Sequence, residues 1–253
     1  AEDKEKRRTE FLQQDWTTLM DKVKRTFGKS KVFNDVNANL YFQIYNAFPS
    51  RDDLGFLKIN PKISASNPRA EKKMNYIYKR QGATNWTIKL NDFKTTKLTR
   101  KKNIPEDVLP TSVSKLIDAY LKRPEVGDQE YLFMKTVVKN GAAEKRPEKQ
   151  SGEVKKWLNK AGIQGRGSLN LLRHTMMTHL WKEEYDPDTP SLELKKLAIA
   201  LRHSPVMSIK YVRPLASELT EDSVANYNDK DLADKEEQGF SSLIPKTLIQ
   251  DLQ

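Results

Sequence analysis

The chain has 253 residues, of which 37% are hydrophobic and 31% are charged, so a buried core can form beneath a strongly ionic surface. The sequence contains no cysteine, which excludes disulfide bonds, catalysis by a thiolate and zinc sites built from cysteine. It has no run of about 18 apolar residues and begins without the apolar stretch of a signal peptide, so we expect neither a membrane span nor secretion.

Charge is distributed unevenly along the chain. The net charge is +11, but the last 39 residues, from Leu215 to Gln253, carry nine acidic and three basic residues, which leaves +17 on residues 1–214. A basic body with an acidic tail predicts a polyanionic partner, with nucleic acid first. A charged surface that serves only solubility is the alternative.

Apolar residues recur at helical spacing in the first 50 positions. Residues 9–28 are predicted to form a helix that ends at Gly28. A second helix is predicted over about residues 34–48, and its apolar face comprises Val36, Leu40, Ile44 and Phe48.

Alternation of apolar and polar residues then indicates a small β-sheet. Gln81-Gly82 separates two alternating segments, which predicts a strand, a turn and a strand. The strands are expected at residues 56–59, 74–80, 85–95 and between Lys97 and Ile104.

The second half of the chain reads as helical. Helices are expected from Thr111, over about residues 152–161 and from Ser168, followed by a helix that ends near His203 and a helix that carries Tyr211. Residues 139–151 are charged and without periodicity, which predicts an exposed loop, and residues 183–190 are predicted to form a second loop.

Residues 168–214 concentrate the groups that can perform chemistry. All three histidines of the chain, His174, His179 and His203, lie there together with Arg173 and Tyr211. An arginine early in one helix, a histidine at the end of the next and a tyrosine eight residues later suit the attack of a phenol on a phosphodiester.

This stretch resembles the catalytic boxes of the tyrosine recombinase (phage integrase) family. The family pattern is His-x-x-Arg-His, then Leu-Gly-His-Ser, then a tyrosine about nine residues later. The corresponding strings here are NLLRH (170–174), LRHS (201–204) and SIKY (208–211). The amino-acid sequence that flanks these motifs most resembles that of recombinases from mobile elements and large DNA viruses.

Two upstream segments extend the resemblance. The family's first arginine follows a helix and precedes an acidic residue, which Arg51 in SRDDLG does, and its lysine sits in a β-hairpin, which Lys94 in NDFKTTK matches, with Lys97 as the alternative. The sequence departs from the pattern at Asn170, where the family has His or Lys, at Arg202, which replaces a glycine, and in the spacing of eight residues from His203 to Tyr211.

The expected chemistry follows from these residue types. Arg51 and Arg173 are predicted to clamp the phosphate, because guanidinium groups stay ionised and match two oxygens while negative charge grows in the transition state. Tyr211 is the predicted nucleophile, His203 a donor to a phosphate oxygen or a proton acceptor, and Lys94 the general acid. Asn170 cannot accept a proton at pH 7, which leaves His203 or water as the base.

The resemblance implies a mainly α-helical catalytic domain with a small antiparallel sheet. We expect N-terminal helices at residues 1–48 as a link to or remnant of a DNA-binding domain, a catalytic domain at residues 49–214 and an acidic tail at residues 215–253. The tail either exchanges between subunits or packs on its own subunit.

The resemblance also implies an intracellular enzyme that breaks and rejoins double-stranded DNA through a phosphotyrosine link. It predicts a dimer or tetramer on DNA and no metal, other cofactor, membrane or small-molecule substrate. A type IB topoisomerase or a telomere resolvase is the nearest alternative, and a non-catalytic DNA-binding protein is the second.

Overall fold

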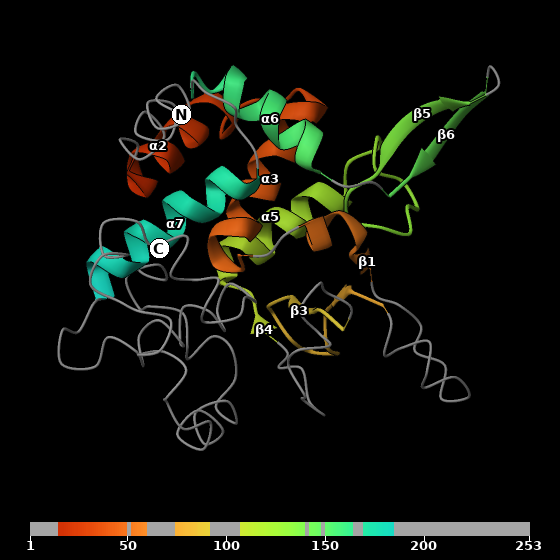
Figure 1. The fold of residues 1–253 in the computed structure, drawn as a ribbon. Helices are drawn as coiled ribbons and strands as arrows, with labels where there is room; N and C mark the ends of the chain where they lie inside the picture. The colour runs from red at the N-terminus through yellow and green to blue at the C-terminus, as the bar shows by residue number, and fades with distance from the viewer. Residues whose placement is uncertain are drawn as a thin grey trace.

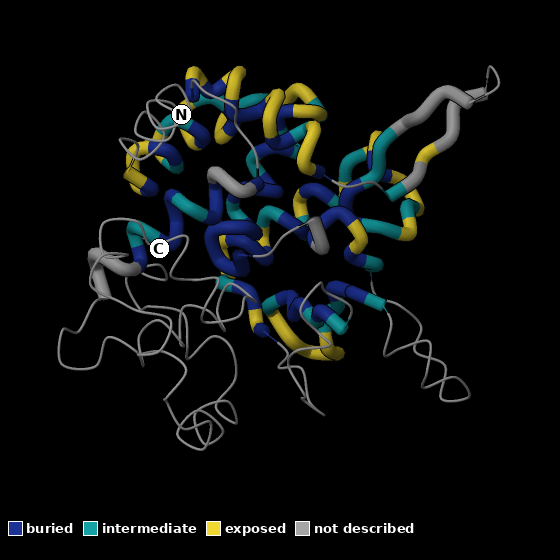
Figure 2. The backbone as a smooth tube through the Cα atoms, in the orientation of Figure 1, coloured by how far each residue is buried: buried dark blue, intermediate teal, exposed yellow. Residues whose placement is uncertain are grey.

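A computed structural model of the chain describes residues 15–49, 52–59, 74–91, 107–139, 142–147, 150–163 and 169–184. In this part of the chain, helices pack around one another, a small sheet lies along one side, and a two-stranded ribbon projects from the body (Figure 1). Buried backbone segments run through the centre of the helical layer, while exposed segments follow its outer surface (Figure 2).

The first described helix, α2 (Trp16–Phe27), has defined ends. Asp15 caps its N-terminus, where Oδ2 accepts hydrogen bonds from the backbone N–H groups of Thr17 (3.1 Å) and Thr18 (3.3 Å). Gly28 ends it as predicted, and only glycine fits closely there because a Cβ would lie 2.5 Å from the Lys24 carbonyl oxygen. Its buried face comprises Trp16, Leu19, Val23 and Phe27.

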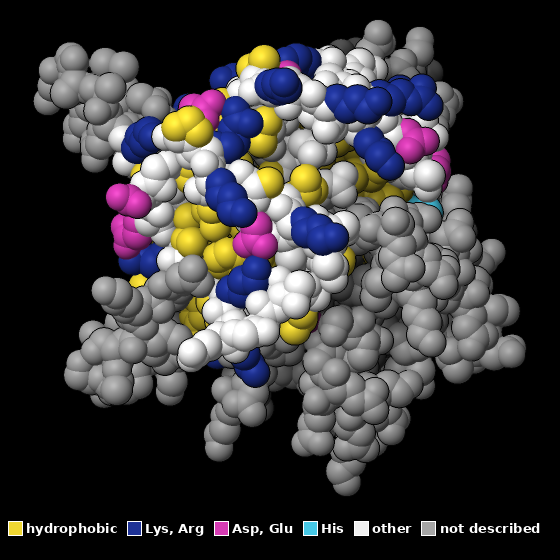
Figure 3. All heavy atoms as spheres, turned by 180° about the vertical axis from the view of Figure 1, so that it is seen from behind, with side chains coloured by type: hydrophobic (Ala, Val, Ile, Leu, Met, Phe, Trp, Pro, Cys, Tyr) yellow, Lys and Arg dark blue, Asp and Glu magenta, His cyan; other side chains and the backbone are white. Residues whose placement is uncertain are grey.

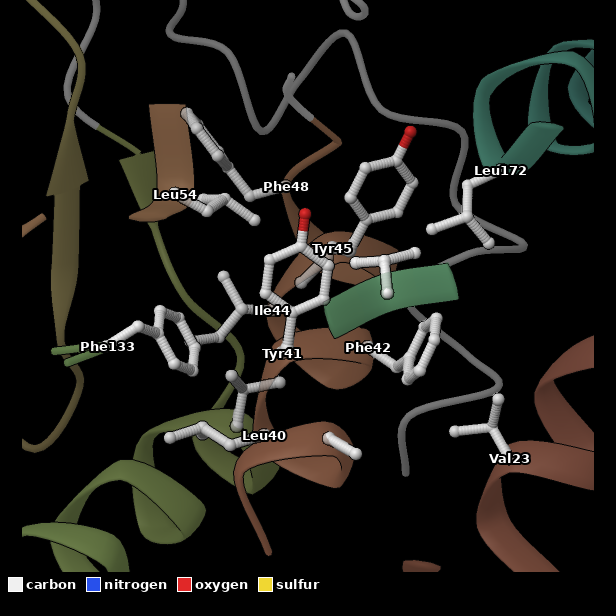
Figure 4. Close-up of a cluster of buried hydrophobic side chains, with 14 of the residues drawn as sticks. Val23, Leu40, Tyr41, Phe42, Ile44, Tyr45, Phe48, Leu54, Phe133 and Leu172 are labelled. Carbon is white, nitrogen blue, oxygen red and sulfur yellow. The ribbon is translucent and has the colours of Figure 1, made fainter. Parts of the chain in front are cut away.

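Helix α3 (Phe33–Ala47) forms the centre of the core. The predicted apolar face is present, but Tyr41, Phe42 and Tyr45 are buried as well, so α3 is covered on more than one side. Figure 4 shows these rings in one cluster with Val23 of α2, Phe133 and Leu172. The Tyr41 ring lies 5.6 Å from both Phe133 and Trp157, measured between ring centroids. Such contacts make α3 the helix on which α2, α5 (Thr111–Leu121) and α6 (Ser151–Lys160) pack.

The sheet has the strand order β1-β2-β3-β4 and confirms the predicted strand–turn–strand. The strands are β1 (Lys58–Ile59), β2 (Tyr76–Tyr78), β3 (Thr87–Lys89) and β4 (Asp107–Val108). Strand β3 pairs antiparallel with β2 and β4, whereas β1 pairs parallel with β2. The sheet is therefore mixed, and the prediction of a purely antiparallel sheet is wrong for β1, because its two residues carry no sequence signal for strand direction. The turn between β2 and β3 contains Gly82 at φ 77°, a conformation that glycine adopts without strain. The strand predicted between Lys97 and Ile104 falls outside the described residues.

Helix α5 (Thr111–Leu121) lies against the sheet and is tied to it by Trp86 and Asp118. The Trp86 backbone N–H donates to Ser114 Oγ (3.0 Å), and its Nε1 donates to Asp118 Oδ1 (2.8 Å). Lys79 Nζ donates to the other carboxylate oxygen of Asp118 at 2.9 Å. Two strands are thereby fixed to one face of α5.

The exposed loop predicted for residues 139–151 is wrong over most of its length. The structure has a hairpin there, β5 (Lys135–Lys139) and β6 (Ala142–Arg146), with Lys139 paired to Ala142. The high charge concealed the strands, although Asn140-Gly141 between them is a strong sequence signal for a two-residue hairpin connection. From Ser151 the chain is helical, as α6 (Ser151–Lys160).

Asp35, in the first turn of α3, links α3 to α6 from a buried position. Its carboxylate is 5% exposed, accepts a hydrogen bond from Ser30 Oγ (2.8 Å) and pairs with Lys160 Nζ (2.6 Å). Burial raises the pKa of Asp35, but the bonds from Lys160 and Ser30 outweigh that effect and hold the pKa below its ordinary value. The ionised carboxylate is therefore the form that stabilises the fold.

We expect Asp35→Asn to lower the free energy of unfolding by about 1–2 kcal/mol at pH 7, allowing for the half-exposed Lys160. Because the folded-state pKa is depressed, the stabilisation is present above the unfolded pKa of about 3.9 and disappears as the pH falls through the lower folded value. Denaturant unfolding at a series of pH values measures it. If the difference in free energy of unfolding between Asp35→Asn and wild type is as large at about pH 2 as at pH 7, the ionised carboxylate does not have this role. Asp21→Asn, at an exposed position, is the control.

Candidate active site

Helix α7 (Leu169–Glu184) carries the first of the two main predicted boxes. Arg173 lies in its second turn and is 1% exposed, which makes it one of the largest fully buried side chains among the described residues. His174 next to it is half-buried, and both residues interact with other parts of the chain. The backbone of Asn170 lies in the first turn of α7. The predicted helix is confirmed. Arg173 belongs to it, and its side chain is buried in the protein, away from bulk solvent.

Apolar residues surround Arg173 along α7. Leu169, Leu172, Met176, Met177 and Leu180 are all buried. Leu172 belongs to the same core cluster as Tyr41, Phe42 and Tyr45 of α3 (Figure 4). The helix that carries Arg173 is thus built into the core by its neighbours in sequence, and the position of the guanidinium depends on that packing.

Arg51 itself lies outside the described residues, but both of its flanks are described. Helix α3 ends at Ala47, with Phe48 buried just after it, and a 3₁₀ helix, η1, follows from Asp52 to Phe56. Tyr45, Phe48 and Leu54 on these flanks share the core cluster with Leu172. The chain on either side of Arg51 therefore reaches the same core as α7, and the meeting of the two guanidinium groups remains a prediction.

Lys94 also lies outside the described residues, in the connection between β3 and β4. These strands are antiparallel neighbours, with Thr87 paired to Val108 and Ile88 to Asp107. The chain therefore leaves β3 and enters β4 at the same end of these two strands.

The remaining predicted site residues fall beyond the described part of the chain. His203 and Tyr211, the acidic tail and the helices predicted after residue 190 all follow Glu184, where the description ends. Of the predicted catalytic set, Arg173 alone is described with its side chain.

His179 has a structural contact at the other end of α7. Its Nδ1 lies 3.5 Å from Oδ1 of Asp15, the residue that caps α2. The histidine side chain is 11% exposed, so the pair joins α7 to the start of α2.

The surface of the described residues is rich in cations. Lys and Arg side chains are spread over the face seen in Figure 3, with Asp and Glu at fewer places. On α2 and just after it, Lys24, Arg25, Lys29 and Lys31 are all exposed. Within the described ranges, no three or more His, Asp or Glu residues are grouped to hold a metal ion. None of the helices in those ranges is long and apolar enough to cross a membrane.

A pocket lies beside the β2–β3 turn. It has a volume of about 390 Å³ and is lined by Arg80, Ala83, Thr84, Asn85, Thr87 and Val108. Val108 is 56% exposed, which gives the pocket one apolar wall. Gln81-Gly82 predicted the turn, but no sequence signal indicated a hollow beside it.

The described fold is similar to that of the site-specific recombinase XerH bound to its difH substrate in a pre-cleavage complex. The TM-score is 0.50 and the identity 16%, over 82% of this chain and 51% of that chain. XerA recombinase aligns with a TM-score of 0.44 and 16% identity, over 81% of this chain and 60% of that chain. The chain thus spans between half and two thirds of the length of these two proteins.

No protein-family model matches the sequence, and no curated protein matches it. At 16% identity the likeness to XerH establishes the fold alone. It confirms the fold class expected from the sequence, which is mainly α-helical with a small sheet.

Proposed function

We propose that this chain is a site-specific DNA recombinase that cleaves and rejoins strands through a 3′-phosphotyrosine intermediate. The proposal assigns the phosphate clamp to Arg51 and Arg173, the nucleophile to Tyr211, and proton transfer to His203 and Lys94. It requires neither metal nor ATP. The fold shared with a site-specific recombinase supports it, together with the two sequence boxes in their family order.

The reaction balances with these groups alone. The Tyr211 oxygen attacks phosphorus and loses its proton to His203 or water, and the bond from phosphorus to the 5′ oxygen breaks. The departing 5′ oxygen takes a proton from Lys94. The phosphodiester becomes a phosphotyrosine ester, so a strand hydroxyl can reverse the step without an energy source.

The burial of Arg173 is the structural observation that carries the proposal. Arginine stays charged in proteins, and enclosing its guanidinium costs several kcal/mol, so an apolar residue of similar size would serve a core equally well or better. In this fold the costly residue occupies the arginine position of the predicted box. A buried, fixed cation acts in low dielectric on the charge that develops on a phosphate.

The position of Arg173 on its helix adds to this effect. Arg173 lies in the second turn of a 16-residue helix, one turn from the N-terminal N–H groups on which partial positive charge accumulates. An anion near that end would experience both the guanidinium and the helix dipole, which supports a phosphate-binding role.

A covalent trapping experiment tests the function. The wild-type chain is incubated in excess EDTA with a pool of labelled, nicked duplexes of random sequence, in which the cleaved end diffuses away and rejoining fails. We expect a labelled band that migrates with the protein in a denaturing gel and disappears on protease treatment. Sequencing of the trapped DNA then yields the target site.

The outcomes separate the rival functions. A trapped pool that shares a sequence supports a site-specific recombinase, whereas a trapped pool of random sequence, with relaxation of supercoiled plasmid, supports a type IB topoisomerase. DNA binding without a covalent adduct would support the third function, that of a non-catalytic DNA-binding protein. Analytical ultracentrifugation on the recovered site tests the proposed dimer or tetramer.

A further inference from the structure

The β5–β6 ribbon, residues 135–146, is the one described element that extends away from the body (Figure 1). Its two five-residue strands pair with each other, and neither joins the four-stranded sheet. A two-stranded ribbon gains little stability from its own pairing, so a projecting ribbon contributes little to holding a fold together. Its presence favours a role in contact with another molecule.

The ribbon is strongly basic. Residues 135–146 contain four basic residues and one acidic residue: Lys135, Lys139, Lys145 and Arg146 against Glu144. The composition therefore predicts an anionic partner.

The strand register concentrates this charge at the base of the ribbon. Lys135 is the cross-strand partner of Arg146, and the next pair joins Thr136 to Lys145. Three of the four basic residues of the ribbon are therefore placed by the register at its base, next to the body of the protein.

Two contacts fix the base of the ribbon to the body. Lys145 Nζ donates to the backbone oxygen of Glu125 at 3.0 Å, and Lys135 Nζ lies 3.6 Å from Glu153 Oε1 in the first turn of α6. Lys145 remains exposed, and the Lys135 side chain is 43% exposed. The base is thus held in place while cationic groups stay accessible.

We propose that the β5–β6 ribbon grips the phosphate backbone of duplex DNA, as a contact separate from the cleavage pocket. The inference rests on the proposed function, which supplies DNA as the partner. A two-stranded ribbon has the width that the major groove accepts, and lysine and arginine are the residues that neutralise backbone phosphates.

The test measures how DNA affinity depends on salt, with a labelled duplex of random sequence and fluorescence anisotropy. The variant Lys139→Gln/Arg146→Gln removes two ribbon charges. Each phosphate contact contributes about 0.9 to the slope of log K against log salt, so the slope should become shallower by about 1.8. Lys24→Gln/Arg25→Gln in the last turn of α2, outside the ribbon, removes the same number of charges and should leave the slope near the wild-type value.

Every outcome is informative. An unchanged slope in the ribbon variant, or an equal change in both variants, would overturn the proposal, as would a ribbon variant that changes only self-association in sedimentation. Thermal unfolding checks that both variants are folded. Covalent trapping at saturating protein is expected to survive in the ribbon variant. Trapping that fails in the wild type refutes the recombinase function, whereas a ribbon effect on the salt slope would still stand.

Discussion

Tyr211→Phe is expected to abolish the covalent adduct with nicked duplex DNA while the affinity for DNA stays within about twofold of wild type. Phenylalanine keeps the ring but lacks the oxygen that forms the ester, so no other step can compensate. Adduct formation is followed in a denaturing gel, and affinity by anisotropy. An adduct that persists in this variant would remove Tyr211 from the mechanism.

Tyr120→Phe is the matched control for the loss of a hydroxyl. Tyr120 is 2% exposed on α5, so its hydroxyl is out of reach of DNA, and burial raises its pKa to about 12, which disfavours the phenolate further. We expect this variant to form the adduct at the wild-type rate. Loss of the adduct in both variants would point to disturbed folding rather than to a missing nucleophile.

Arg173→Lys is expected to slow adduct formation by about 10²–10³-fold, the usual effect of removing one preorganised donor from a developing negative charge. Lysine keeps the positive charge but lacks the planar fork that holds two phosphate oxygens. The rate is measured in single turnover with saturating protein, below the unfolding temperature of the variant, so that weaker binding or reduced stability does not contribute.

Arg25→Lys on the exposed end of α2 is the control for that substitution and should leave the rate unchanged. If Arg173→Lys is folded and reacts within about threefold of wild type, Arg173 serves the core rather than the phosphate. A loss of stability without a loss of rate would lead to the same conclusion.

The helices and the central strands were predictable because their signals are local. Helices α2, α5 and α6 each have apolar residues at helical spacing, and the segments around β2 and β3 alternate on either side of Gly82. Burial then follows the predicted faces: Leu19 and Val23 on α2, and Val154 and Trp157 on α6, are all buried.

Other features depend on contacts that no short stretch of sequence encodes. Strand β1 has two residues, and its parallel pairing with β2 depends on the tertiary fold. The β5–β6 ribbon was predicted as a loop because its charges mask the strand pattern, although Asn140-Gly141 was visible. Tyr41 and Tyr45 were absent from the predicted face of α3, since a central helix is buried on several sides.

The candidate site came from motif order rather than periodicity. The spacing of apolar residues predicts α7 but does not indicate that Arg173 is enclosed with them, because arginine is normally exposed. The resemblance singled out this arginine, and its catalytic role stays a prediction. Arg51, Lys94, His203 and Tyr211 lie outside the described residues and stay predictions.

The central position of α3 has a practical consequence for anyone who shortens this protein. A fragment that starts at residue 49, the predicted catalytic boundary, would lack the aromatic rings of Tyr41, Phe42 and Tyr45 and expose the apolar sides of α5 and α6 to water. Such a fragment should be insoluble when expressed. A fragment designed for crystallisation or NMR should therefore begin upstream of Asp15, so that the whole of α2 and its N-terminal cap are retained.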